Sequence, residues 1–170
     1  MKRFLAALLV FVLCFSFAAC EGSPSKEVGG ETTANGSKGE ETFGLNETAV
    51  FNNLKFTATE IKESAGTDFF TPAAGNVFVG VKFTIENVSD EEQTVSTMLL
   101  FNGYADDVKC EYSLSAACAF DEGTLDGSIA PGKKLVGWYA VEVPEGWSTI
   151  ELEVQANILS NSKAKFAFSK

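Results

Sequence analysis

Short runs of alternating apolar and polar residues dominate the chain from residue 43 onward. Between Val77 and Ile85 every second position is apolar, whereas Lys82 and Thr84 lie on the other face. A period of two is typical of a strand with one buried face. Residues 54–59, 95–101, 108–114, 135–143, 150–155 and 166–168 show related runs, separated by turn sequences such as Pro131-Gly132. About seven antiparallel strands of this kind predict an all-β fold of two packed sheets.

The first twenty residues have a different pattern. Lys2 and Arg3 precede an apolar run over residues 4–17, and two alanines then precede Cys20. This layout is typical of a lipoprotein signal peptide at residues 1–19, with a lipobox-like end. The thiol of Cys20 would carry the lipid, and two acyl chains suffice for stable attachment to a membrane. An ordinary cleaved signal peptide and a transmembrane anchor are the alternatives, although a membrane span needs about 20 apolar residues.

Residues 20–42 form a segment with almost no large apolar side chains, rich in glycine, serine, threonine and glutamate. Such a composition buries too little surface to offset chain entropy, so we expect a disordered linker after Cys20. Residues 43–170 are apolar and aromatic, and their length suits one domain with its own core.

Charge and composition restrict the functions open to the chain. Its formal net charge is −10, which opposes binding to nucleic acid. The sequence has no histidine, which removes Ser-His-Asp and Cys-His nucleophiles and the commonest zinc ligand. We therefore expect no enzymatic activity, no cofactor and no metal. Proteins and sugars remain open as partners.

Two cysteines lie within the predicted domain, at Cys110 and Cys118. An even pair in an exported domain favours a disulfide. The alternative is a pair of buried, unpaired thiols.

Two segments resemble a known bacterial family. Residues 75–89 are similar to its G-x-x-F-V-x-V-x-x-x-x-x-N-x-S strand, and residues 127–132 with 137–144 are similar to a later hairpin region. The family consists of lipoproteins of unknown function with an immunoglobulin-like extracellular domain. The resemblance implies an immunoglobulin-like sandwich. A telomeric repeat-binding factor label sometimes given to this family conflicts with the signal peptide and the acidic charge.

The best binding candidates are Phe69 and Phe70, which lie in a predicted loop with few other anchors. Exposed aromatic side chains can stack on a sugar or fill a partner's pocket, but they also commonly close the end of a sandwich core. Acidic side chains suggest either a calcium site or solvated loops, and their spacing matches no defined calcium loop. They are Asp106, Asp107, Asp121, Glu122 and Asp126.

Together these features predict a lipid-anchored protein on the extracytoplasmic side of the cell membrane. We expect a non-catalytic binding or accessory module, with the membrane lipid and an envelope protein or glycan as partners. An exported enzyme that uses paired carboxylates on glycosides is one alternative, and a structural spacer in the envelope is another.

Overall fold

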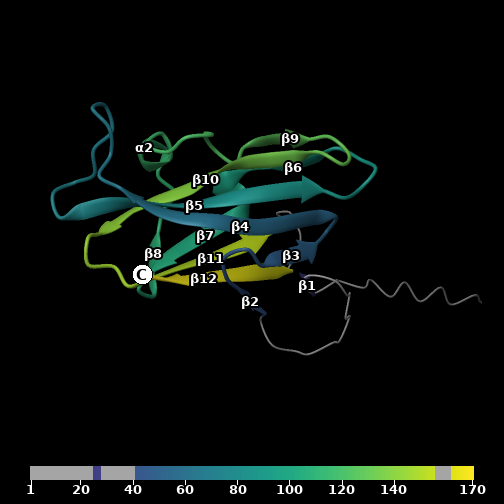
Figure 1. The fold of residues 1–170 in the computed structure, drawn as a ribbon, viewed down its shortest axis with the longest axis horizontal. Coiled ribbons are helices and arrows are strands. Elements are labelled where there is room, and N and C mark those ends of the chain that lie inside the picture. The colour runs from purple at the N-terminus through teal and green to yellow at the C-terminus, as the bar shows by residue number, and fades with distance from the viewer. Residues whose placement is uncertain (1–24, 28–40, 156–161) are drawn as a thin grey trace, which may run out of the picture.

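The computed structural model describes residues 25–27, 41–155 and 162–170, and two sheets pack face to face within them (Figure 1). The first sheet contains, in spatial order, β1 (Ser25–Glu27), β3 (Thr48–Phe51), β4 (Leu54–Ser64), β5 (Asn76–Asn87) and β10 (Lys134–Pro144). The second contains β2 (Thr42–Phe43), β12 (Lys163–Ser169), β11 (Thr149–Gln155), β7 (Phe101–Ala105) and β8 (Val108–Cys110). A two-stranded sheet pairs β6 (Gln93–Val95) with β9 (Gly127–Ile129).

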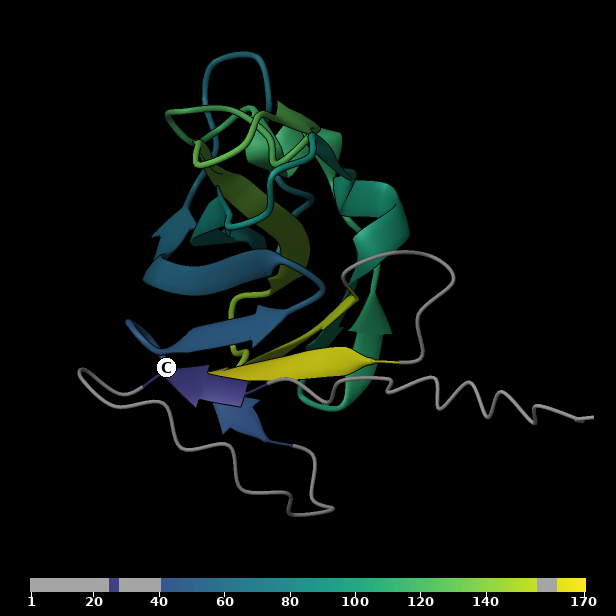
Figure 2. The same cartoon turned by 90° about the vertical axis from the view of Figure 1, so that its right-hand side faces the viewer.

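The predicted all-β sandwich is confirmed. Seven of the described strands have four or more residues, and five have only two or three. The described strands pair antiparallel except for the two-residue contact of β2 with β12. Figure 2 shows the same layers after a turn of 90°, with β1 beside β3.

Alternation along the strands places one apolar face of each sheet in a shared core. On β11, Ile150, Leu152 and Val154 are buried, and the residues between them are half-buried. Phe83 of β5 reaches across to the second sheet, where its ring centroid lies 5.4 Å from that of Phe101 and 5.1 Å from that of Phe166. Both contacts are edge-to-face, an arrangement that aromatic rings prefer. Aromatic side chains therefore join the two sheets.

A second, smaller core covers the outer face of β5 and β10. It explains why residues 77–81 are apolar on both faces of the strand. The helix α2 (Leu114–Ala117) packs on this face, and the ring of Phe120 stacks on Trp138 at 4.8 Å. The buried members of this cluster are Phe78, Ala116, Ala117, Phe120, Trp138 and Ala140.

The predicted strand over residues 95–101 is interrupted by the short helix α1 (Thr97–Leu100). Thr97 is buried, and both its backbone N–H and its hydroxyl donate to the carboxylate of Asp126, at 2.8 and 2.9 Å. This contact comes from a residue distant in the sequence. Local alternation therefore could not reveal it.

Part of the predicted linker belongs to the first sheet. Ser25–Glu27 forms β1, which runs antiparallel to β3 with Ser25 opposite Val50 and Glu27 opposite Thr48. The strand was missed because its three residues are polar and carry no alternation. The second sheet likewise begins at Thr42, one residue before the predicted domain start.

The long edge strand β10 is covered by two crossing segments. The N–H of Ser113 donates to the carbonyl of Ala140, and the N–H of Trp138 donates to the carbonyl of Gly123, both at 2.9 Å. Gly137 permits the close crossing, because a Cβ there would lie 2.5 Å from a carbonyl oxygen of the crossing chain. The other edge strands of the two large sheets, β1, β2 and β8, have two or three residues each.

Candidate binding loop and neighbouring sites

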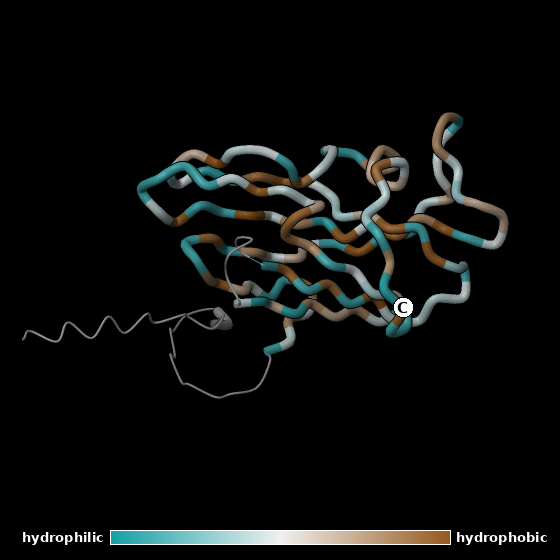
Figure 3. The backbone as a smooth tube through the Cα atoms, turned by 180° about the vertical axis from the view of Figure 1, so that it is seen from behind, coloured by the Kyte–Doolittle hydropathy of each residue, from teal (hydrophilic) through white to brown (hydrophobic). Residues whose placement is uncertain are grey.

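A loop over residues 65–75 joins β4 to β5 and projects beyond the sheets (Figure 1). Seen from behind, the same loop is the projection whose far end carries apolar residues (Figure 3). The side chain of Phe69 is 89% exposed and that of Phe70 is 39% exposed. The structure thus places both predicted residues on one loop. Phe69 therefore does not close the end of the sandwich core, which was the alternative interpretation.

Hydrogen bonds within the loop close a tight turn around Phe69. The N–H of Thr67 donates to the carbonyl of Phe70 at 2.7 Å. The hydroxyl oxygen of Thr67 accepts from the N–H groups of Phe69 and Phe70, at 3.3 and 3.1 Å. Gly66 has a φ of 91°, and a Cβ there would overlap the Phe70 carbonyl oxygen. The turn therefore holds Phe69 outward by its own bonding, since core contacts do not fix it.

The base of the loop is fastened to β10. A carboxylate oxygen of Glu142 accepts from the side-chain amide of Asn76 and from the N–H of Ala73, both at 2.9 Å. These two bonds, the Asn76 bond foremost, hold the pKa of Glu142 below its ordinary value of 4.5. The N–H of Glu145 also donates to the carbonyl of Gly75 at 3.1 Å. Sequence reasoning missed this anchor because Glu142 lies far along the chain from the loop.

A second aromatic residue beside the loops, Trp147, is part of the core. It is 4% exposed, and its indole N–H donates to Glu63 at 2.6 Å. Lys170 pairs with the same carboxylate at 2.6 Å and lies over the indole ring at 5.2 Å. The Lys170 bond first, and then the Trp147 bond, lower the pKa of Glu63. Trp147 therefore closes this part of the sandwich core.

The predicted disulfide between Cys110 and Cys118 is absent from the structure, where both thiols are free. Cys110 ends β8 and is half-buried, with its sulfur next to Gly103. Cys118 is exposed at the end of α2. The chain crosses from one sheet to the other between them, where Tyr112 bridges to Val141 of β10. Cys110 therefore lies in the second sheet, whereas Cys118 follows the helix that packs on the first sheet.

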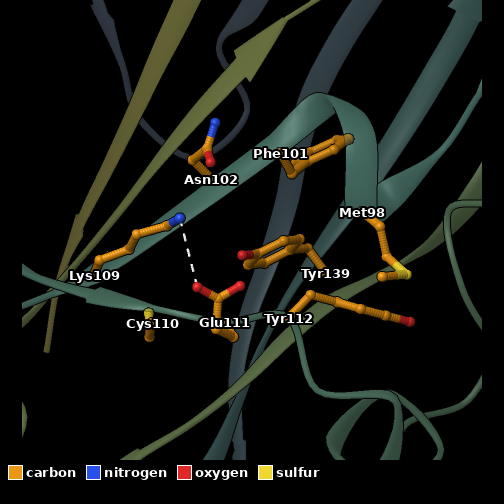
Figure 4. Close-up of a pocket in the computed structure, with 8 residues that line it drawn as sticks. All are labelled: Met98, Phe101, Asn102, Lys109, Cys110, Glu111, Tyr112 and Tyr139. Carbon is orange, nitrogen blue, oxygen red and sulfur yellow. Dashed lines mark ion pairs between the residues drawn. The ribbon is translucent and has the colours of Figure 1, made fainter. Parts of the chain in front are cut away.

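A small pocket opens beside Cys110, where the ends of α1, β7 and β8 meet β10 (Figure 4). Its volume is about 140 Å³, and Lys109 and Glu111 pair across its mouth at 3.5 Å. Burial raises the pKa of the Cys110 thiol to about 11 and that of the Tyr112 hydroxyl to about 12. Both groups are protonated at neutral pH, so Cys110 is a weak nucleophile. The pocket is lined by Met98, Phe101, Asn102, Lys109, Cys110, Glu111, Tyr112 and Tyr139.

Three of the five acidic residues considered for calcium, Asp106, Glu122 and Asp126, have structural partners. Asp106 accepts from the N–H groups of Ser148 and Thr149, and these bonds, Thr149 first, lower its pKa. Glu122 accepts from Lys82 at 2.7 Å and from the indole of Trp138 at 3.1 Å. Asp126 caps α1, as described above. In the described ranges no three His, Cys, Asp or Glu side chains are grouped closely enough to hold a metal ion.

The predicted lipid-attachment residue, Cys20, lies outside the described residues, as does the signal peptide at 1–19. Within the described ranges, no helix is long and apolar enough to cross a membrane. Cys20 therefore remains a prediction from the sequence.

The fold and the loop define a β-sandwich domain with a projecting aromatic turn. The chain belongs to the family described as Domain of unknown function (DUF4352), which matches residues 43–165. No curated protein matches the chain.

Solved structures with the same fold come from several bacteria. One is YcdA, a candidate lipoprotein of Bacillus subtilis, with 14% identity and a TM-score of 0.58 over 69% of this chain and 37% of that one. An uncharacterised β-sandwich protein of Clostridium difficile has 14% identity and a TM-score of 0.53, covering 81% and 99%. The secreted protein MPT63 of Mycobacterium tuberculosis has 12% identity and a TM-score of 0.54, covering 79% and 100%. At these identities the likeness shows the fold alone.

Proposed function

We propose that the protein is a lipoprotein held to the cell membrane through Cys20, with an immunoglobulin-like domain on the extracytoplasmic side. The domain is a non-catalytic binding module for an envelope protein or glycan, and Phe69 is its main contact. The signal-peptide pattern supports the anchor. The descriptions of two structural neighbours, one a candidate lipoprotein and one secreted, agree with this location.

The observation that carries the binding proposal is the exposure of Phe69 on a closed turn. Leaving a phenylalanine ring in water forgoes roughly 1.5–3 kcal/mol of burial. The turn that displays it uses a threonine hydroxyl, a left-handed glycine and an anchoring carboxylate. Interfaces commonly use such rigid aromatic anchors, because little conformational entropy is lost when a partner covers them.

A capture experiment with matched variants tests the contact. The lipid-free chain, residues 21–170, is immobilised and exposed to envelope extract, and bound proteins and glycans are identified by mass spectrometry. Phe69→Ser should lose a partner that the unaltered chain retains. Val108→Ser is the control, because Val108 is also an exposed apolar residue, at 69%. A set of bound molecules that is unchanged by Phe69→Ser would refute the role of this loop.

The anchor has its own test. The mass of the protein purified from membranes should correspond to a chain that begins with acylated Cys20. Cys20→Ser should release the protein from the membrane fraction. An unmodified Cys20, or a mature chain with another first residue, would refute the anchor without affecting the capture result.

A further inference from the structure

We propose that residues Ser25–Glu27 act as an N-terminal strap: docked on β3, they hold the sandwich close to the membrane with the Phe69 loop pointing away. When the N-terminal strap leaves β3, the domain can move outward on a much longer tether. The inference rests on the proposed lipid attachment at Cys20, whereas the docking itself is seen in the structure.

The register of the sheet places the N-terminal strap and the Phe69 loop at opposite ends of the domain. Ser25 lies opposite Val50, and Val50 lies opposite Lys55 near the start of β4. The loop follows Ser64, nine residues further along the same strand. At about 3.3 Å per residue, this separates the two ends by about 30 Å. Figures 1 and 2 both show β1 and the projecting loop at opposite sides of the molecule.

The position of the N-terminal strap in the sequence determines how far the domain can reach. Ser25 is five residues after Cys20, so a docked strap keeps this end of the sandwich within about 18 Å of the lipidated residue. Without docking, the first paired residue is Thr42, 22 residues after Cys20. A chain of that length spans at most about 80 Å.

The docking is suited to release. It involves three residue pairs at the edge of the sheet, and β3 remains paired with β4 when they separate. Short edge elements near a chain end open at far lower cost than the core of a domain. The sandwich can therefore stay folded while the N-terminal strap leaves, because the longer strands keep their pairing with one another.

Hydrogen exchange tests the docking. The variant Ser25→Pro/Lys26→Pro should disrupt it. Only every second residue of an antiparallel strand donates its N–H to the neighbouring strand, so one of two adjacent prolines must remove a donor. The control is Ser37→Pro/Lys38→Pro, which alters an identical Ser-Lys pair further along the same predicted linker. We expect the amides of β3 to exchange about tenfold faster in the first variant only, with those of β5 unchanged. Equal exchange of β3 in all three proteins would overturn the docking.

Resonance energy transfer tests whether the N-terminal strap sets the distance between the domain and the membrane. The acylated full chain carries Cys110→Ser and a donor dye on Cys118, which is exposed. It is inserted in vesicles of four parts phosphatidylcholine to one part phosphatidylglycerol with an acceptor on the lipid headgroups. Ser25→Cys/Val50→Cys, oxidised before labelling, joins a facing pair of residues and locks the N-terminal strap in place.

The locked protein and the one with a native strap should show similar, higher transfer, and the Ser25→Pro/Lys26→Pro variant should show lower transfer. Equal transfer in the native and proline proteins would overturn the inference, whether or not the locked protein differs. Absence of acyl groups on Cys20 would instead refute the proposed anchor, and with it the effect of the N-terminal strap on the distance between domain and membrane. The exchange result would still report whether the N-terminal strap docks on β3.

Discussion

The aromatic contact between the sheets makes Phe83 the most informative position for a stability measurement. Its side chain is fully buried and contacts the rings of Phe101 and Phe166 edge-to-face. Truncation of a buried phenylalanine to alanine costs about 3–5 kcal/mol. Each aromatic contact is worth about 0.5–1.5 kcal/mol beyond the buried area. We therefore expect Phe83→Ala to lower the free energy of unfolding by about 4–5 kcal/mol, near the top of that range.

Urea unfolding of the lipid-free chain, followed by tryptophan fluorescence, measures the effect. With a slope of about 2 kcal/mol per molar urea, the midpoint should fall by about 2 M. Phe69→Ala is the matched control, and at 89% exposure its stability should change by no more than about 0.5 kcal/mol. A loss below about 2 kcal/mol for Phe83→Ala, or similar losses in both variants, would refute the assignment of these side chains to core and surface. Phe83→Leu offers a milder change if the alanine variant does not fold.

Three further predictions concern other parts of the domain. Gly137→Ala should lower the melting temperature strongly, because its Cβ would meet a backbone carbonyl, whereas Gly146→Ala has open space and should have little effect. Alkylation at pH 8 should modify Cys118 quickly and Cys110 slowly, because burial raises the pKa of Cys110 to about 11; two unreactive thiols would show a disulfide after all. Folding lowers the pKa of Glu142, so its contribution to stability is present above pH 4.5, the ordinary value, and is lost as the pH falls through the folded-state pKa. Urea unfolding at pH 6 and pH 3 should therefore show a smaller acid loss in Glu142→Gln, and an unchanged loss would contradict this account.

Period-two alternation was sufficient to predict the sandwich and most of its longer strands. It succeeds on β11, where buried and half-buried residues alternate without interruption. It fails at residues 97–100, because the carboxylate of Asp126 caps a helical turn there. It also cannot detect Ser25–Glu27, which is ordered by an available strand edge and contains no apolar residue.

The candidate site was predictable to a similar degree. The pair Phe69-Phe70 stood out because large aromatic residues are unusual in a polar loop. Which of the two is the more exposed depends on the hydroxyl of Thr67 and on the left-handed Gly66, so composition could not decide it. The separation of Cys110 from Cys118 was also beyond the sequence, because the chain between them crosses from one sheet to the other.

The covered edge of β10 has a consequence if the protein is held on a membrane through Cys20, as proposed. Exposed strand edges are templates for pairing with neighbouring molecules, and confinement in two dimensions would raise the rate of such encounters. The eleven residues of β10 would be the longest template of this kind, but their backbone groups bond to Ser113 and Gly123 at two points. With the N-terminal strap docked on β3, the remaining described edges of the large sheets offer two or three residues each. Many copies can therefore crowd together without their sheets fusing edge to edge.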